Sequence, residues 1–345
     1  MASKPTLTAV GDIKIDKPII KKLDQNVLST INNSLFLVGN LEGPITLRGF
    51  PQEKLVNIRM NPELKGELKK LGLKLVCLAN NHIMDYGPEG LIDTINILDE
   101  LGIHRVGAGM SIGEALKPCI VKIENITLSF LAFSSTLPPN FAATRERPGA
   151  APARVKTSYY YEPTWLAEEP GIPFLAETHV IEEDKKTIGK TIKLAKEKSD
   201  LCVCLFHWGL GISPFHFQLL DYQEELAHYA VECGCDVVIG GHPHVIQPVE
   251  TYNGKPIFYS LGNFIFHQEY LSESMSPFGA ILELYLNKEE VERVEMLFVK
   301  LDENGNPALL SEMESKTLIE SLNLTSKLNR EKVEIKNGRM VISTS

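Results

Sequence analysis

The sequence predicts a layered α/β protein, and two features of the chain support this prediction. Short apolar runs such as 74–77, 201–205 and 236–239 alternate with segments that have the period of amphipathic helices. Such runs are typical of strands buried on both faces of a sheet, with helices packed over them. The 345 residues, 43% of them hydrophobic and 23% charged, are enough to form a core in one large or two ordinary domains.

The first hundred residues repeat a strand–loop–helix unit three times. Proline stands in the first turn of each expected helix, and a glycine, Gly72 or Gly102, ends two of them. The repetition is typical of a sheet layered with helices. The expected strands are 7–10, 35–38 and 74–78, and the expected helices are 18–33, 62–71 and 88–101.

The second half of the chain has a more antiparallel character. Hairpins are expected around Glu124-Asn125, which joins 119–121 to 127–132, and at Asn253-Gly254. We interpret residues 1–300 as one domain and 301–345 as a C-terminal appendage. The other expected strands are 201–206, 236–239, 245–250, 256–260, 280–286 and 291–300, with helices at 185–198, 222–233 and about 310–328.

Residues 137–178 form a long segment without a regular period. A loop of this length inside a compact domain is usually functional or disordered. Arg145 and Arg147 can pair with anions, which suggests a lid that contacts substrate. An equally weighted alternative is a surface excursion that packs on its own aromatic residues, Tyr159-Tyr160-Tyr161 and Trp165.

Charge and composition argue against several classes of protein. A net charge of −9 disfavours a general nucleic-acid binder. No apolar run approaches the ~20 residues of a membrane helix, and no secretory signal is recognisable. We therefore expect a cytoplasmic protein whose six cysteines are reduced. In the pairs Cys202/Cys204 and Cys233/Cys235 one residue separates the thiols, fewer than zinc sites use, so a place in the core is expected.

Five of the expected strands end in residue types that bind metals. Open α/β sheets place their sites at the carboxyl ends of strands. A lone histidine at such a place is more often structural, but together these groups supply imidazole, carboxylate and amide ligands. That set suits Zn, Mn or Fe(II), and its size suits two ions. The residues are Asp12, Glu42, Asn81-His82, His207 and the His242-Pro243-His244 unit, in which Gly240-Gly241 allows close approach.

Six motifs occur in order between about residues 7 and 266. They are Gly11-Asp12, Gly39-Asn40-Leu41-Glu42-Gly43-Pro44-Ile45, Ala79-Asn80-Asn81-His82-x-x-Asp85-x-Gly87-x-x-Gly90-Leu91, His207-Trp208-Gly209, His242-Pro243-His244-Val245-x-Gln247 and Tyr259-Ser260-Leu261-Gly262-Asn263-Phe264. This set resembles the CapA-like family of capsule and poly-γ-glutamate synthesis proteins, a branch of the calcineurin-like metallophosphoesterase superfamily. Residues beyond about 300 lie outside the resemblance.

The resemblance implies a four-layer α-β-β-α sandwich with mixed sheets and a two-metal site at one edge. His82 is then a proton donor to the leaving group or a contact to the charged oxygen. Asp85 orients its imidazole, or, with equal weight, caps the following helix. The metal ligands implied are Asp12, Glu42 as the bridging acid, Asn81, His207, His242 and His244.

Two positions depart from the family pattern. Lys14 stands where the superfamily's Asp-x-His opening has histidine, and Gly211 stands where family members commonly carry an acid. We interpret Lys14 as an anion contact and expect it to bind substrate together with Asn80, Arg145 and Arg147.

The predicted function is metal-dependent hydrolysis of a small-molecule or polyanionic substrate. The bond is a phosphoester or phosphoanhydride, or a γ-glutamyl-type amide, because activated water attacks either. The alternative is a non-catalytic accessory or ligand-binding protein of polyglutamate or capsule metabolism with a degraded metal site, which Lys14 and Gly211 favour. The oligomeric state is left open.

Overall fold

Two mixed β-sheets form the centre of the protein. The computed structural model describes residues 6–211, 215–267, 276–328 and 333–343. In the ten-stranded sheet the order is β19-β20-β17-β16-β1-β2-β3-β4, with β15 paired to β1 and β18 to β17. Its strands are β1 (Leu7–Ile13), β2 (Leu37–Leu41), β3 (Leu73–Cys77), β4 (His104–Val106), β15 (Asn263–Ile265), β16 (Phe278–Leu286), β17 (Val291–Leu301), β18 (Pro307–Leu309), β19 (Val333–Lys336) and β20 (Arg339–Ser343).

The second sheet has six strands in the order β13-β14-β12-β11-β7-β6. Strands β7, β11, β12 and β14 run parallel, and antiparallel strands lie at both edges. In the first sheet β1 to β4 are parallel and β16 runs antiparallel to β1. The strands of the second sheet are β6 (Cys119–Ile123), β7 (Ile126–Ser134), β11 (Leu201–His207), β12 (Val237–Gly241), β13 (Val249–Tyr252) and β14 (Lys255–Phe258).

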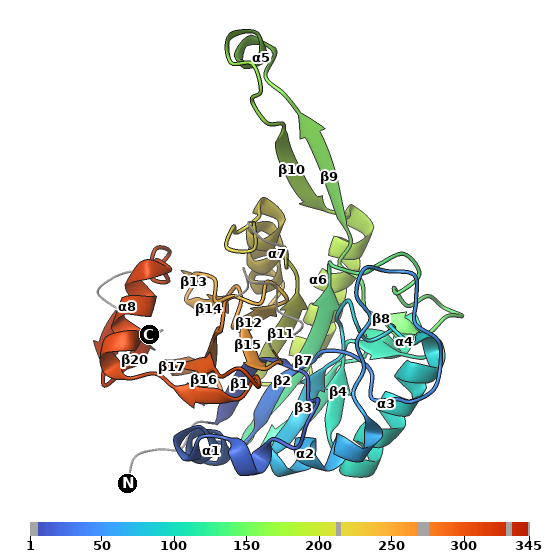
Figure 1. Cartoon of the computed structure of the whole chain (residues 1–345), viewed down its shortest axis with the longest axis vertical. Helices are drawn as coiled ribbons and strands as arrows, with labels where there is room; N and C mark the ends of the chain where they lie inside the picture. The colour runs from blue at the N-terminus through green and yellow to red at the C-terminus, as the bar shows by residue number, and fades with distance from the viewer. Residues whose placement is uncertain (1–5, 212–214, 268–275, 329–332, 344–345) are drawn as a thin grey trace.

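Three buried clusters show that the sheets and helices form four layers. Leu75 of β3 and Leu205 of β11 belong to one cluster, which lies between the two sheets. A second cluster joins the outer face of the ten-stranded sheet to α1 (Gln25–Asn32), α2 (Lys65–Lys70) and α3 (Gly87–Leu101). A third joins the six-stranded sheet to α6 (Glu182–Lys196) and α7 (Asp221–Glu232) (Figure 1). The α-β-β-α sandwich with mixed sheets is therefore confirmed.

The apolar runs in the sequence are explained by burial on both faces. In β11, Val203 and Leu205 face the other sheet, while Cys202 and Cys204 face the helices. Alternate residues of a strand point to opposite faces, so a strand between a sheet and a helix layer is apolar throughout. Cys233 and Cys235 also lie in the helix-side cluster, which places both Cys-x-Cys pairs in the core, as expected.

Several predicted boundaries were wrong at the ends of elements. The helix predicted at 18–33 is a short 3₁₀ turn, Ile20–Lys22, followed by α1, because the Asp24 side chain accepts bonds from the N–H groups of Asn26 and Val27 and starts a new helix. The helix predicted at 62–71 likewise divides into the 3₁₀ turn Pro62–Leu64 and α2. Strands β1 and β2 extend to Ile13 and Leu41, so Asp12 lies within a strand instead of after it.

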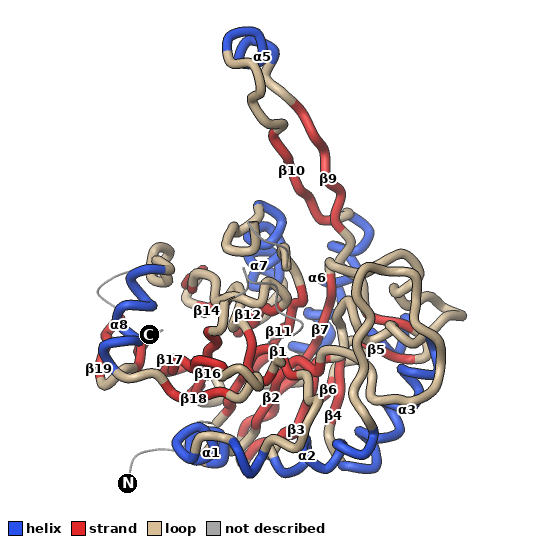
Figure 2. Tube along the Cα trace, in the orientation of Figure 1, coloured by secondary structure: helices blue, strands red, loops and turns tan. Residues whose placement is uncertain are grey.

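Residues 137–178 are more ordered than the sequence suggested. β8 (Gly149–Ala150) pairs with β5 (Ala108–Gly109), close to the four-residue helix α4 (Ile112–Ala115). β9 (Val155–Tyr160) and β10 (Leu175–Val180) then form an antiparallel ribbon with α5 (Pro163–Glu168) at its tip. This ribbon projects away from the body (Figure 2). The lid role of the segment stays a prediction.

The chain after residue 301 is built into the ten-stranded sheet. β18 and β20 pair with β17, and β19 pairs with β20. Leu318 and Ile319 of α8 (Glu312–Ser321) join the cluster between the sheets. A domain boundary near residue 300 stays a prediction. None of the helices in the described ranges has the length and apolar character to cross a membrane.

Candidate metal centre

The two sheets bring the ends of five strands to one place. Parallel strands within each sheet share a carboxyl edge, and the edges of the two sheets lie side by side (Figure 1). The ten-stranded sheet carries acid and amide groups there, and the six-stranded sheet carries imidazoles. The groups are Asp12 in β1, Glu42 after β2, Asn81 and His82 after β3, His207 at the end of β11, and His242 and His244 after β12.

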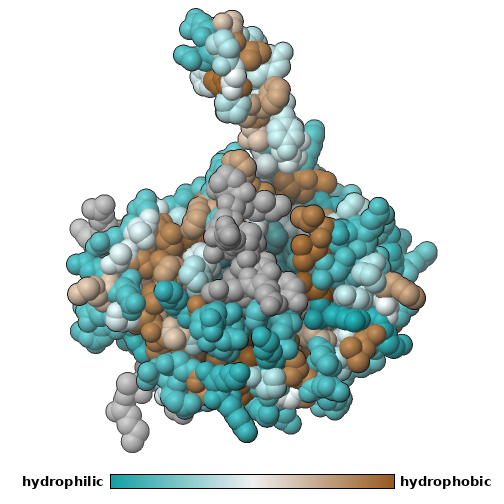
Figure 3. Space-filling model, in the orientation of Figure 1, coloured by the Kyte–Doolittle hydropathy of each residue, from teal (hydrophilic) through white to brown (hydrophobic). Residues whose placement is uncertain are grey.

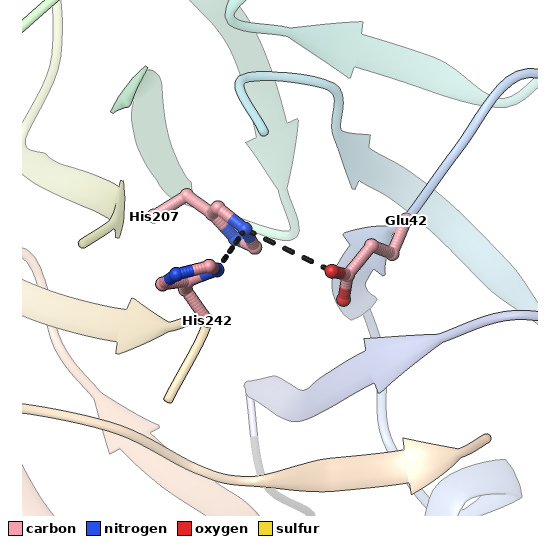
Figure 4. Close-up of side chains that lie close together, drawn as sticks. All are labelled: Glu42, His207 and His242. Atoms are coloured by element: carbon pink, nitrogen blue, oxygen red, sulfur yellow. Dashed lines mark hydrogen bonds and ion pairs between the residues drawn. The ribbon is translucent and has the colours of Figure 1, made fainter. Parts of the chain in front are cut away.

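Two groups of potential metal ligands share one carboxylate, Glu42. Glu42, His207 and His242 form the first group, and Asp12, Glu42 and His244 form the second. Within each group the ligand atoms all lie within 4.8 Å of one another. Figure 4 shows Glu42 pointing toward the two imidazoles of the first group. The Asn81 Oδ1 lies 2.8 Å from His207 Nε2, which adds an amide oxygen beside this group.

Glu42 has the environment of a carboxylate that neutralises a cation. Its side chain is fully buried, and both carboxylate oxygens lack a hydrogen-bond partner among the described residues. Burial raises the pKa of Glu42 well above its usual range, and the nearby Asp12 raises it further. A buried ionised carboxylate needs a partner of opposite charge. Divalent cations at the two groups would supply one, so the residues present fit the metals that the sequence predicts.

The two imidazoles of the first group are suited to act as neutral ligands; His207 is buried and His242 is partly buried. Burial lowers the pKa of His207 and His242 well below the usual value, and His244 nearby has the same effect on both. A neutral imidazole presents a nitrogen lone pair, which is the form that binds metal ions. His242 Nδ1 and His207 Nε2 lie 3.1 Å apart, so one ion can contact both rings.

Side chains outside the two groups hold the ligands in place. The Asn40 amide donates to Asp12 Oδ1 at 2.8 Å. Asn263 Oδ1 lies 2.8 Å from His244 Nδ1, which leaves Nε2 of that ring facing Glu42 at 3.6 Å. Such outer hydrogen bonds fix the ring orientation of metal ligands. Both asparagines belong to motifs seen in the sequence, but their role as supports requires the fold.

The His-Pro-His turn is held in a strained conformation. His242 and His244 have φ values of +96° and +56°, which non-glycine residues rarely adopt. The Gly241 backbone passes so close to Asp12 that a Cβ at residue 241 would lie 3.0 Å from Asp12 Oδ1. The turn therefore packs closely against β1. Its strained backbone places His242 and His244, which follow a strand of the six-stranded sheet, beside the acids of the ten-stranded sheet.

His82 and Asp85 form a pair beside the two groups. Asp85 Oδ2 lies 2.6 Å from His82 Nδ1 and accepts the Ile58 N–H at 2.7 Å. His82 Nε2 faces Glu42 at 3.9 Å. Burial lowers the pKa of His82, and the hydrogen bond to Asp85 opposes this. The N-cap residue of α3 is Tyr86, and the Asp85 carboxylate bonds instead to Lys54, Ile58 and His82.

Lys54 is a site residue that the sequence analysis missed. Its ammonium donates to Asp85 Oδ1 at 2.7 Å and to the Asn81 carbonyl at 2.6 Å, and it lies 3.2 Å from His82 Nδ1. It comes from the loop between β2 and α2, which carries no metal-binding motif. Only the folded arrangement of that loop places a cation beside the imidazole.

Asn80, Lys14 and Arg147, which were predicted to bind substrate, each have contacts of their own in the structure. Asn80 is buried, and its amide donates to the Leu41 carbonyl and to Asn40 Oδ1. Lys14 is also buried and forms an ion pair with Asp16. Arg145 is exposed, and the Arg147 guanidinium donates to Asn140 Oδ1 and the Ala142 carbonyl. Substrate binding by these four residues stays a prediction.

A cavity of about 570 Å³ opens in front of the site. Lys54, His82 and His244 line its inner part, and apolar side chains, among them Leu55 and Leu210, line the rest. At Gly211 a Cβ would lie 3.2 Å from the His242 ring. A side chain at this position would therefore require a small shift of the His242 ring.

The fold and the site together define an α-β-β-α sandwich that carries a candidate centre for two metal ions with one shared carboxylate. The chain belongs to the family "Bacterial capsule synthesis protein PGA_cap", whose model matches residues 6–268. It is similar to the PGA biosynthesis protein CapA of Bacillus subtilis, with 30% identity over 91% of this chain and 76% of that protein.

The alignments with two other relatives and one solved structure cover smaller shares of those chains. The capsule biosynthesis protein CapA of Bacillus anthracis is 28% identical over 77% of this chain and 60% of its own length. A Mycobacterium tuberculosis protein, whose name calls it a polyglutamine synthesis accessory protein, is 32% identical over 66% of this chain and 54% of its own length. A solved structure from Staphylococcus aureus, described as that of a 5'-nucleotidase, has 12% identity, covers 92% of this chain and 57% of that chain, and has a TM-score of 0.43.

Proposed function

We propose that the protein is a metal-dependent hydrolase with two divalent ions, of Mn, Zn or Fe, held by the two groups that share Glu42. The observation that carries this proposal is the buried Glu42 carboxylate, whose two oxygens have no hydrogen-bond partner among the described residues and which belongs to both groups of potential ligands. When bound, divalent cations supply Lewis acidity toward a phosphoryl or carbonyl oxygen and acidify water. Asn81, His207 and His242 hold one ion with Glu42, and Asp12 and His244 hold the other.

The residues beside the ions position and protonate the substrate. His82, with Nδ1 held by Asp85, presents Nε2 toward Glu42. In its doubly protonated form it donates the Nε2 proton to the leaving group and is left as the neutral ring with its proton on Nδ1. Lys54 fixes the Asp85 carboxylate and adds positive charge near the developing negative charge. The cavity beside the ions admits a phosphoester, a phosphoanhydride or a γ-glutamyl-type amide.

Metal titration combined with two assays tests the proposal. We expect apo-protein to bind two equivalents of Mn²⁺ or Zn²⁺ in calorimetry and to cleave either a generic phosphodiester or a γ-glutamyl anilide. Glu42→Gln removes the shared charge and should abolish binding of both ions, and activity should fall at least about 100-fold. His244→Ala should remove one equivalent only. The control is His104→Ala, at an exposed position of β4.

A second candidate is an accessory protein that binds its ligand without cleaving it. It is favoured by Lys14, which occupies a position where an additional histidine ligand is expected, and by the accessory role named for the Mycobacterium tuberculosis relative. Two bound ions without cleavage of either substrate would support this candidate. Failure of the wild-type protein to bind any divalent ion would contradict the hydrolase, and it is the result expected of an accessory protein whose metal site is degraded.

A further inference from the structure

The ribbon that projects from the body is anchored only at its root. We call residues 155–180 the arm; it comprises β9, α5 and β10 (Figure 1). At the root, Arg154 forms a two-point ion pair with Asp184, at 2.6 and 2.8 Å, and His179 lies 3.7 Å from Glu225. In the described part of the chain, no hydrogen bond or ion pair joins residues 156–178 to the body. The arm is therefore firmly held at one end and unsupported along its length.

The arm exposes aromatic side chains on both of its faces. Tyr159 is opposite Ala176 in the ribbon, and Tyr160 is opposite Leu175, so the two tyrosines point to opposite faces. At the tip, Trp165 is 51% exposed and Phe174 69%. In Figure 3 the arm carries brown, hydrophobic patches between pale and teal residues. A two-stranded ribbon is marginal in water by itself, and clustered exposed aromatics mark protein interfaces.

The negative charge of the arm restricts the kinds of surface that can bind to it. Between residues 155 and 180 the chain has one lysine, Lys156, and four glutamates, Glu162, Glu168, Glu169 and Glu177. The tip itself carries three of these acids and no basic residue. An anionic lipid surface or a polyglutamate chain would be repelled. The matching surface is instead apolar with positive charge.

The protein carries such a surface beside the cavity, on the site loop, which we define as residues 47–59. Phe50 is 83% and Leu55 92% exposed, with Leu47 and Val56 also exposed. Two exposed arginines, Arg48 and Arg59, carry positive charge on this loop, and Arg48 also pairs with Asp93. The loop has one exposed acid, Glu53. The arm extends away from the body, so its own tip does not meet this loop (Figure 2). A second copy can present the loop to it.

We propose that two copies of this chain form a dimer by exchanging arms, with the aromatic tip of each arm packed on the site loop of the other copy. A two-fold axis relates the two copies, so the same contact occurs twice, as in most homodimers. Each arm then borders the partner's cavity, because Lys54 and Leu55 of the site loop line it. The proposal does not depend on hydrolysis.

Sedimentation equilibrium of the full chain tests the exchange. The wild type should be a dimer. Trp165→Ser with Phe174→Ser, on the arm, and Phe50→Ser with Leu55→Ser, on the site loop, should each weaken dimerisation by at least roughly 30-fold. An equimolar mixture of the two variants should dimerise more tightly than either alone, because one intact arm meets one intact loop. Met313→Ser, 81% exposed on α8, is the matched control and should leave the dimer unchanged.

Cross-linking identifies the contact itself. In a Cys119→Ser background, Phe174→Cys protein mixed with Phe50→Cys protein should give a heterodimer with a short bismaleimide, whereas Phe174→Cys mixed with Met313→Cys should not. A monomeric wild type at all concentrations overturns the proposal. A dimer that only the arm variants weaken also overturns it, because the arm would then contact a surface other than the site loop. Binding of the arm to anionic phospholipid vesicles would overturn it as well.

Discussion

At the scale of single residues, the site depends on buried charges that lie in contact with one another. Glu42 and Asp12 are fully buried acids, and burial raises the pKa of each. Their proximity is costly unless cations lie between them. The Lys54 ammonium is the cation that neutralises Asp85, whose side chain is also fully buried. The Lys54 ammonium is thus a structural cation as well as a site residue.

Replacing Lys54 separates its structural role from its role in positioning. Lys54→Met leaves the buried Asp85 carboxylate without its cation, so the free energy of unfolding should fall by about 3 kcal/mol. The His82–Asp85 pair loses a fixed neighbour, and kcat should fall more than KM changes. Urea unfolding and steady-state kinetics measure the two effects.

Lys54→Arg is the matched variant because it keeps the charge but changes the shape of the donor. It should recover most of the stability and only part of kcat. Lys54 supplies no ligand atom but donates to the Asn81 carbonyl, so calorimetric ion affinity should fall by about 10-fold in Lys54→Met and by less in Lys54→Arg. Equal stability of Lys54→Met and wild type would contradict the assigned ion pair.

The residues that sequence reasoning found and missed differ in a physical way. Glu42, His207 and His242 lie at or directly after the ends of strands, and Asp12 lies one residue before the end of β1, so the rule that strand ends meet at one edge was enough to group them. Lys54 contacts those groups from a loop, and Asn263 contacts them from the first residue of the three-residue strand β15. Loop conformation depends on tertiary contacts, so no local period in the sequence predicts where these side chains lie.

At the scale of elements, long strands and helices were predicted from their periods, and short elements were not. β15 has three residues, and it pairs with β1 in parallel with an irregular register at Asp12. The arm strands lack the alternation of a half-buried strand, because both faces of the ribbon are exposed. Burial on at least one face is what generates the pattern that sequence reading detects.

The contact between β1 and the turn before β15 gives a prediction at this scale. A Cβ on Gly11 would lie 1.9 Å from the Gly262 carbonyl oxygen, next to the bond from Asp12 N–H to that same oxygen. Because backbone must move, Gly11→Ala should cost about 1–3 kcal/mol of stability and should shift Asp12 out of its ligand position. Chemical denaturation and ion titration check both effects.

Gly66 provides the control within the same chain. It lies in α2, and no atom is within 4 Å of the place its Cβ would take. Gly66→Ala should therefore stabilise the protein by about 0.5–1 kcal/mol and leave ion binding unchanged. If Gly11→Ala behaved like Gly66→Ala, the close approach of β1 and the turn would be wrong.

At the scale of the whole molecule, the order of strands could not be derived from the sequence. Local patterns predicted most strands, but not that β16, far along the chain, lies beside β1 in the same sheet. The four layers were predicted from the family resemblance. The C-terminal residues lay outside that resemblance, and the structure adds their strands to the edge of the ten-stranded sheet.

An ion-pair cluster joins this C-terminal part to the sheet and makes its stability depend on pH. Arg339 of β20 contacts Glu283 of β16 and, at 2.7 Å, Glu295 of β17. Burial raises the pKa of Glu283 above its ordinary value of 4.5, although Arg339 opposes the shift. The folded protein therefore binds this proton more tightly than the unfolded chain. Its contribution to stability is present below pH 4.5 and is lost as the pH rises through the folded pKa.

Removing Arg339 should enlarge this loss. In Arg339→Met the opposing cation is absent, so the pKa of Glu283 rises further and more stability is lost at neutral pH, about 1–3 kcal/mol for a buried acceptor without its partner. The difference in Tm between wild type and variant should be smallest near pH 4, where Glu283 is neutral, and should grow toward pH 7. Lys336→Met, at an exposed pair with Glu334, should show no such trend. A difference that is constant from pH 4 to pH 7 would mean that the Glu283 carboxyl is not the titrating group that links the C-terminal strands to the sheet.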